Sequence, residues 1–183
     1  MIPLRQELQL ELVPGRDTWS GSLRATLQVR RATRRFFLLL AGGDPSRVEL
    51  AGPHGAVPLT YGWRGRDTLL VETAAPLAPG PLGMNVAWLG SFAAASRGPR
   101  TVGRGAIVMA PGAGGGIPLW PGVAPATSWR LTVRAPDSCT VRSNLARLAG
   151  SRQGSWRTWE FASRRPLPAD SIAFQLRAGR RGK

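Results

Sequence analysis

The feature that most constrains the fold of this chain is an alternation of apolar and polar side chains with a period of two residues. It is clean in residues 7–12 and again in residues 19–30, where Leu23, Leu27 and Val29 fall on one face of the pattern. Because successive side chains of a β-strand point to opposite faces, this period predicts half-buried strands. Shorter segments predict further strands at 36–40, 47–50, 57–63, 68–72, 83–89, 129–135, 140–144, 155–161 and 171–176.

Glycine, proline and aspartate separate these segments at short intervals, in residues 14–17, 42–45, 52–53, 65–67 and 79–80. Such residues favour turns, and no window of the chain has the period of a helix. We therefore expect an all-β fold, a β-sandwich or twisted open barrel of mostly antiparallel strands. Residues 1–177 are expected to form one domain, and residues 178–183 a basic tail. The predicted inward-facing residues are Leu23, Leu27, Val29, Leu69, Val71, Leu131 and Val133.

Residues 93–126 break the pattern, because glycine, alanine and proline replace the alternation. Such a stretch predicts either a long surface loop or a backbone packed closely against a neighbour. The glycine cluster 112–116 is similar to a phosphate-binding loop, yet no Lys-Ser/Thr follows it, and Ile117 stands where the dinucleotide pattern needs glycine. We interpret the cluster as a loop beside an apolar edge that lacks a partner. That edge consists of Ile107, Val108, Leu119 and Trp120.

The chain carries a formal net charge of +15, from 25 basic and 10 acidic residues, and every basic residue except Lys183 is arginine. Two interpretations stay open. Proteins from GC-rich genomes gain arginine, glycine, alanine and proline and lose lysine, so the charge can reflect codon usage. Alternatively, the chain binds nucleic acid or another polyanion weakly and non-specifically, because arginines mixed with tryptophans form stacking platforms. The tryptophans concerned are Trp120, Trp129, Trp156 and Trp159.

The chain has one histidine, His54, and one cysteine, Cys139, which excludes most metal and nucleophile chemistry. A structural zinc site needs about four such ligands, and a Ser-His-Asp or Cys-His mechanism would have to use His54. That histidine lies in residues 52–55, Gly-Pro-His-Gly, which predict a turn. The carboxylates of Asp137 and Glu160 have no partner in the sequence for acid–base hydrolysis. We therefore expect no catalytic, substrate-binding or metal-binding residue, and no cofactor.

Two uncharged stretches, 73–96 and 105–129, are long enough to cross a membrane, but several prolines interrupt each of them. Because proline breaks a helix, we expect no membrane-spanning segment. The N-terminus carries charge where a secretion signal needs an apolar core. We therefore expect a soluble, cytoplasmic protein.

Several short motifs stand in an order that is found in one protein family. Residues 8–12 form an alternating strand, and an aromatic-x-Gly motif, Trp19-Ser-Gly21, then opens a long second strand. With these motifs in this order, the chain resembles the N-terminal β-domain of the aminopeptidase-N-like zinc metallopeptidases, which implies the all-β fold of that domain. Weaker matches extend over nearly the whole chain, in residues 67–71, 76–80, 129–136, 141–144, 159–161, 165–168 and 172–174.

The chain departs from this family at the functional motifs. In the family, a Thr-Gln-x-Glu segment helps to bind the substrate's amino end, and a segment ending in Asp-Glu-Pro follows it. When Pro125 is placed on that last proline, Met109 replaces the glutamine, and residues 122–124 replace an aromatic residue and both acids. The zinc motif His-Glu-x-x-His needs two histidines, and the chain has one. The resemblance therefore implies a non-catalytic scaffold or truncated remnant whose partner is a separate peptidase catalytic domain or another protein.

Overall fold

The computed structural model describes residues 1–92, 99–102, 105–110, 117–120 and 126–179. In this part of the chain the regular structure is strand, apart from one turn of 3-10 helix, η1 (Ala169–Ser171), which confirms the predicted all-β fold. No helix in the described residues is long and apolar enough to cross a membrane. The strands are β1 (Ile2–Glu11), β2 (Thr18–Val29), β3 (Thr33–Leu39), β4 (Gly43–Gly52), β5 (Gly55–Val57), β6 (Leu59–Trp63), β7 (Thr68–Leu77), β8 (Gly80–Ser91), β9 (Arg100–Val102), β10 (Ala106–Met109), β11 (Ser128–Pro136), β12 (Cys139–Ser143), β13 (Ala146–Gln153), β14 (Trp156–Ala162) and β15 (Phe174–Ala178).

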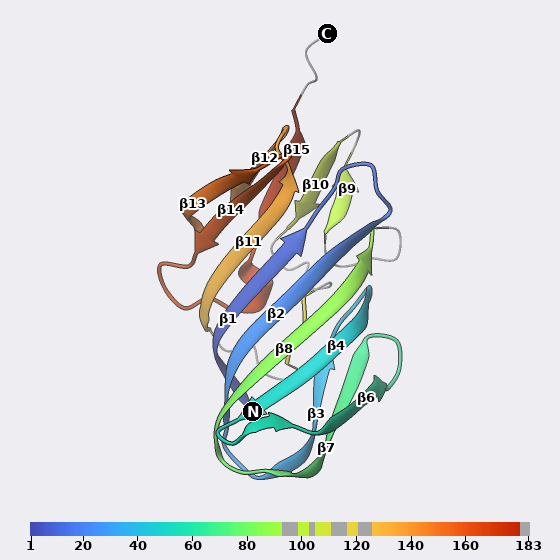
Figure 1. Cartoon of the computed structure of the whole chain (residues 1–183), viewed down its shortest axis with the longest axis vertical. Helices are drawn as coiled ribbons and strands as arrows, with labels where there is room; N and C mark the ends of the chain where they lie inside the picture. The colour runs from blue at the N-terminus through green and yellow to red at the C-terminus, as the bar shows by residue number, and fades with distance from the viewer. Residues whose placement is uncertain (93–98, 103–104, 111–116, 121–125, 180–183) are drawn as a thin grey trace.

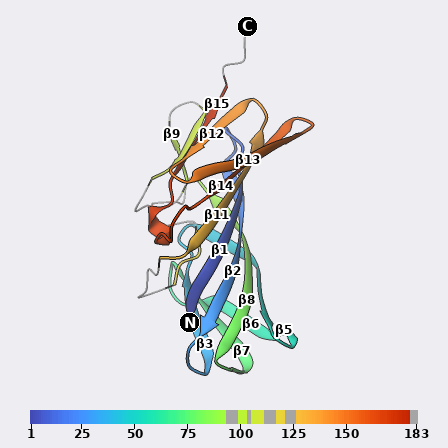
Figure 2. The same cartoon turned by 90° about the vertical axis from the view of Figure 1, so that its left-hand side faces the viewer.

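The strands form three sheets, and none of them closes into a barrel. The largest has eight strands in the order β13-β14-β11-β1-β2-β8-β4-β5 and runs the length of the molecule (Figure 1). Among the described strands only β1 and β11 pair in parallel, and the other pairs are antiparallel. A four-stranded sheet, β12-β15-β10-β9, and a three-stranded sheet, β3-β7-β6, lie at opposite ends of the molecule (Figures 1 and 2).

One continuous hydrophobic core joins the three sheets. The alternation of β1, β2, β8 and β11 turns their apolar residues to one face of the large sheet, where residues of the two smaller sheets pack against them. Leu38 and Leu69 come from the three-stranded sheet, and Ile107 and Leu176 come from the four-stranded sheet. All of the predicted inward-facing residues are buried, which confirms that expectation: Leu23, Leu27, Val29, Leu69, Val71, Leu131 and Val133.

Two tryptophans and two glycines interlock across β2 and β8. Trp19 pairs with Gly90, and Gly21 pairs with Trp88, so each indole lies over the glycine of the opposite strand. A Cβ atom added at Gly90 would lie 2.2 Å from the ring of Trp19, and one added at Gly21 would lie 2.4 Å from the ring of Trp88. The two rings meet edge to face, with their centroids 6.2 Å apart and an angle of 88° between their planes. The motif Trp19-Ser-Gly21 is therefore a packing device of the core.

The structure corrects the expectation of an apolar edge without a partner. β10 lies inside the stretch 93–126, pairs with β15 and directs Ile107 into the core. Trp120 is buried as well, and the backbone of Leu119 exchanges two hydrogen bonds with that of Leu39, at 2.8 and 2.9 Å. Ile107 and Trp120 therefore belong to the core, and Leu119 is held by its backbone pairing with Leu39. The glycine cluster 112–116 falls outside the described residues.

Several elements differ from the sequence expectation. Strand β4 begins at Gly43, inside the turn expected at 42–45, and the strand expected at 57–63 is interrupted at Pro58 between β5 and β6. The segment 146–153 forms β13, which was not predicted because seven of its eight residues are exposed and no apolar face marks it. The strand expected at 171–176 begins only at Phe174 and ends at Ala178, after η1. The N–H of Gly179 then donates to the carbonyl of Ser138 at 2.7 Å. Residues 180–183 fall outside the described part, and the extent of the domain and tail stays a prediction.

Candidate functional site

The outer face of the eight-stranded sheet, which the two small sheets do not cover, carries rows of polar side chains. The alternation that buries the leucines of β1 and β2 turns the intervening residues outward. In one row, Gln9 of β1 stands between Ser22 of β2 and Thr132 of β11. In the next row, Glu11 stands between Ser20 and Arg134. Residues far apart in the sequence are therefore brought together by strand register alone.

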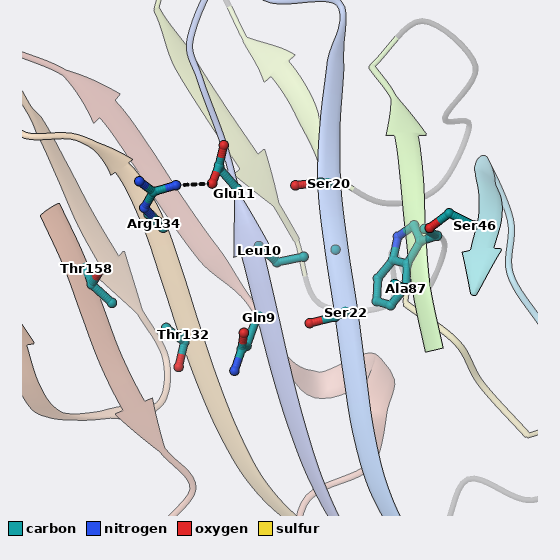
Figure 3. Close-up of a pocket in the computed structure, with 12 residues that line it drawn as sticks. Gln9, Leu10, Glu11, Ser20, Ser22, Ser46, Ala87, Thr132, Arg134 and Thr158 are labelled. Atoms are coloured by element: carbon teal, nitrogen blue, oxygen red, sulfur yellow. Dashed lines mark hydrogen bonds and ion pairs between the residues drawn. The ribbon is translucent and has the colours of Figure 1, made fainter. Parts of the chain in front are cut away.

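These rows border a hollow of about 500 Å³ in the middle of the sheet (Figure 3). Hydroxyl groups from β2, β11 and β14 and one amide, that of Gln9, surround it, together with a single ion pair. Such groups both donate and accept hydrogen bonds, which suits a neutral polar ligand or the polar surface of a protein. The lining residues are Gln9, Leu10, Glu11, Ser20, Gly21, Ser22, Ser46, Ala87, Trp88, Thr132, Arg134 and Thr158.

The charges of this hollow are neutralised locally. The guanidinium of Arg134 donates to the carboxylate of Glu11 (Figure 3). The same guanidinium lies 4.2 Å from the centre of the Trp156 ring. A cation above an indole is attracted by the negative face of the ring. No histidine or cysteine and no second carboxylate lines the hollow in the described structure. The arrangement supplies hydrogen bonds, but it lacks the paired groups that acid–base or nucleophilic catalysis uses.

Part of the remaining outer face is also balanced in charge. Arg5 pairs with Glu7 at 2.8 Å, and Arg47 pairs with Glu49. The amide of Asn85 donates to the second oxygen of Glu49 at 3.3 Å. The hydrogen bond from Arg47 holds the pKa of the Glu49 carboxyl below its usual value, and Asn85 adds to the effect. Arg24 and Arg130 of the same face are exposed and have no ion pair in the described structure, and further positive charge lies elsewhere.

One such place is the outer face of the four-stranded sheet. Strand register sets Arg177 beside Thr140, and Gln175 between Arg142 and Val108. Arg100 of β9 lies opposite Val108 and extends the same row. None of the strands β9, β10, β12 and β15 contains an acidic residue. Arg100, Arg142 and Arg177 thus form a basic sheet face, which we call the arginine face.

The structure places the titratable residues singled out in the sequence far from any shared site. His54 is exposed in the predicted turn between β4 and β5, and Cys139 is buried in the core, where burial raises the pKa of its thiol. Asp137 forms an ion pair with Arg152. No group of three histidine, cysteine or acidic residues that could hold a metal occurs in the described residues. A single exposed histidine and a single core cysteine do not fit a zinc site.

Three of the four tryptophans considered for a stacking platform are buried. Trp120, Trp129 and Trp159 belong to the hydrophobic core, so that part of the sequence interpretation is wrong. Trp156 is half-buried and lies against Arg134. Trp129 and Trp159 are buried because they lie on the inward face of β11 and β14.

The positions matched to the family's substrate-binding motifs carry no polar group where they are described. Met109, which replaces the glutamine, is 2% exposed and faces the core from β10. Residues 122–124 lie outside the described part. The residues of the hollow were not identified from the sequence. The available signal was the run of hydroxyl residues on the polar side of the alternation, as in Ser20 and Ser22.

Comparison with known proteins gives matches in structure alone. No protein-family model and no curated protein matches the sequence. The M1 zinc metallopeptidase from Deinococcus radiodurans superposes with a TM-score of 0.76 at 19% identity, and a mutant of an M1 zinc metallopeptidase from the same organism with 0.79 at 18%. A two-domain M1 zinc metallopeptidase mutant bound to L-tryptophan gives 0.79 at 18%.

Each of these alignments covers 96% of this chain but only 42% of the peptidase chain. The matched part is the N-terminal domain of the peptidase, and the catalytic domain is outside it. The likeness expected from Trp19-Ser-Gly21 and the order of the strands is thus confirmed at the level of fold. The chain has the fold of the N-terminal β-domain of the M1 zinc metallopeptidases.

Proposed function

We propose that this chain is a non-catalytic β-domain that acts as a scaffold for a separate polypeptide, in the first place a peptidase catalytic domain. The observation that supports this most is the coverage, since 96% of this chain matches 42% of a zinc metallopeptidase. In the peptidase the matched domain is joined to a larger remaining part of the chain, and we expect this chain likewise to have a surface that contacts a second domain. We also propose that it works in the cytoplasm.

The polar outer face suits this role. Contact surfaces between domains are more polar than permanent subunit interfaces. The hydroxyl groups around the hollow, such as Ser20, Ser22 and Thr132, can form hydrogen bonds with a partner without leaving a buried charge unpaired. The ion pair between Glu11 and Arg134 fixes two of the lining side chains before any partner binds.

The first test measures the zinc content and the aminopeptidase activity of the purified chain. The second test asks whether a separate catalytic domain binds to it. We expect no stoichiometric zinc by elemental analysis and no turnover of an aminoacyl-anilide. Stoichiometric zinc together with turnover would overturn the proposal. The DNA downstream of the coding sequence is then searched for a frame with His-Glu-x-x-His. The product of such a frame should elute with this chain in size-exclusion chromatography, and separate elution would contradict the scaffold role.

A second candidate function is weak, non-specific binding of nucleic acid, and the arginine face supports it. Arg100, Arg142 and Arg177 share a surface without acidic residues on its strands. Arginine–phosphate contacts release counterions, so affinity falls with salt by a slope of about 0.7 per contact on single strands. Without an exposed tryptophan platform there, stacking adds little to this binding.

The test uses a fluorescent single-stranded oligonucleotide and a double substitution, Arg142→Glu with Arg177→Glu. We expect binding that weakens steeply with salt and falls about tenfold in the variant. The matched control, Arg31→Glu with Arg66→Glu, makes the same change in net charge at two exposed turn positions and should have a much smaller effect. Equal losses in both variants would show that net charge alone attracts the oligonucleotide and would exclude the arginine face as its site.

A further inference from the structure

The strand β13 forms the free edge of the eight-stranded sheet. It pairs with β14 on one side, and on its other side the described structure has no strand (Figure 1). Its only backbone partner recorded in the described residues is β14. In an antiparallel sheet, alternate residues direct their N–H and C=O groups away from the existing neighbour, so an edge strand offers a row of unpaired groups. β13 therefore has room for one more strand along its length.

The side chains of β13 make this edge basic. Arg147 pairs with Phe161 on β14, and Arg152 pairs with Arg157. Phe161 and Arg157 are four positions apart and lie on one face, so Arg147 and Arg152 share a face although they are five positions apart. The register shift between Arg147 and Ala149 causes this, because a bulge inserts one extra residue.

The charges on this face are mostly unpaired. Arg152 forms an ion pair with Asp137, whereas Arg147 and Arg157 have none within the described part of the chain. β13 contains no acidic residue. Gly150 lies between the two arginines of the strand, and a Cβ atom placed there would be 3.1 Å from the Thr158 carbonyl oxygen and 3.4 Å from the Arg147 guanidinium. The Arg147 guanidinium therefore lies close to Gly150, along the same face of the strand.

A second basic feature lies at the first residue of β13. A pocket of about 420 Å³ is lined there by Ala146, Arg164 and Arg165, among others. Arg164 and Arg165 are exposed and have no ion pair in the described structure. A strand that ran antiparallel to β13 would have its C-terminal end beside Ala146. Its terminal carboxylate would therefore lie near two arginines.

Charge decides which kind of strand fits this edge. If a second copy of the chain paired through β13 in the antiparallel direction about the strand centre, Arg147 of one copy would oppose Arg152 of the other. Like charges in directly opposed positions destabilise a sheet. An acidic strand would instead form ion pairs at both positions. The edge therefore disfavours its own copy and favours an acidic partner.

We propose that β13 binds an acidic, extended C-terminal segment of another protein as a ninth strand of the large sheet. Two carboxylates of the segment, four residues apart because of the bulge, contact Arg147 and Arg152. The end of the segment reaches Arg164 and Arg165. This interaction is independent of the scaffold role and uses a different surface from the polar hollow.

The first experiment compares synthetic peptides by fluorescence anisotropy at low salt with the full chain. One ten-residue peptide carries Glu at positions i and i+4 near its free C-terminus, with Thr and Val elsewhere. A second has the same composition with Glu at i and i+3, which places the acids on opposite faces of a strand. We expect the first to bind up to about fivefold more tightly, because the second peptide can form only one of the two cross-strand ion pairs. Equal affinity of the two peptides would overturn the proposal.

A further pair of peptides tests the backbone. Each is methylated on the nitrogens of one set of alternate residues, and only one set can face β13. One methylated peptide should lose binding and the other should keep it. If both bind like the parent, side-chain charge alone holds the peptide, and the added strand is wrong. If no peptide of the series binds, the proposal is wrong, and the bulge and the arginines serve only to keep the edge strand unpaired.

The variant Arg147→Glu should weaken the i, i+4 peptide about tenfold. Arg31→Glu, a matched control at an exposed turn far from β13, should leave it unchanged. Circular dichroism confirms that both variants keep their strands. Two other outcomes would overturn the proposal: a dimer of the native chain that Arg147→Glu abolishes, or an oligonucleotide that requires Arg147 while the peptides do not bind.

Discussion

The two faces of the eight-stranded sheet are built from the same strands but are held in different ways. On the inner face, one row across the sheet consists of Leu131, Leu8, Leu23 and Val86, all fully buried. One residue further along, the outer row contains Thr132, Gln9, Ser22 and Ala87, around a polar hollow. A shift of one residue thus separates core from recognition surface.

The difference shows which face sets stability. Burying apolar surface contributes about 25 cal/mol per Å², and a buried leucine contributes roughly 2 kcal/mol. An exposed ion pair contributes about 0–1 kcal/mol. The inner face therefore accounts for the fold, and the outer face can change to suit a partner at little cost in stability. Substitutions that are matched in type but placed on opposite faces test this distinction.

The largest difference is expected for leucine. Leu131→Ala leaves a cavity in the centre of the core and should lower the free energy of unfolding by about 2–5 kcal/mol. Leu89→Ala removes the same atoms from a side chain on the outer face that is 51% exposed, and its effect should stay below about 1 kcal/mol. Urea denaturation followed by tryptophan fluorescence measures both. Similar losses in the two variants would contradict the division between the faces.

A smaller difference is expected for two glycines of the same strand. Gly90→Ala would force a methyl group against the Trp19 ring and should cost about 1–3 kcal/mol. Gly83→Ala places its methyl group on the outer face, where the nearest atom, the Ala51 carbonyl oxygen, is 3.5 Å away. Because alanine restricts the unfolded chain, Gly83→Ala should be neutral or stabilise by up to about 1 kcal/mol. A stable Gly90→Ala protein would show that the tryptophans can repack.

A third comparison stays on the outer face. Arg134→Ala removes both the ion pair with Glu11 and the contact with the Trp156 ring, and should cost about 1 kcal/mol. Arg24→Ala, an exposed arginine of the same face without an ion pair in the described structure, should cost less than about 0.5 kcal/mol. Thermal unfolding in low and in high salt separates the two, since salt should weaken only the first effect. If the two variants lost the same stability, the ion pair between Arg134 and Glu11 would contribute nothing measurable.

The inner face was largely predictable from the sequence, because burial imposes the two-residue period on residues such as Leu23 and Leu131. The same rule failed where a strand has no buried face. β13 was missed for this reason, and β9 and β10 were missed because Gly and Pro surround only a few apolar residues, among them Ile107. The packing reason for Trp19-Ser-Gly21 also needed the structure, since only strand register sets Trp88 against Gly21.

The candidate site was less predictable than the fold. A sequence shows that Ser20 and Ser22 are outward, but it does not show that Thr132 of a distant strand lies in the same row. That neighbourhood depends on the parallel pairing of β1 with β11, which no local pattern encodes. The arginine face depends in the same way on β12, β15 and β9 meeting in one sheet. Turns such as the one at His54 were predictable because their chemistry is local.

The smallest expected effect concerns the pH response of the outer face. The hydrogen bond from Arg47 lowers the pKa of the Glu49 carboxyl in the folded protein. A carboxyl with a depressed folded pKa contributes stability above its unfolded value, about 4.3, and loses it as pH falls through the folded value. Carboxyl chemical shifts followed by NMR should therefore give Glu49 a pKa below that of Glu in an unfolded peptide. In Arg47→Gln the pKa should rise toward the ordinary value, while Arg24→Gln should change it much less.

Because Glu49 is exposed, stability at acid pH should differ little between the two variants. A marked acid sensitivity of Arg47→Gln would show that the outer face contributes more to stability than its exposed ion pairs predict.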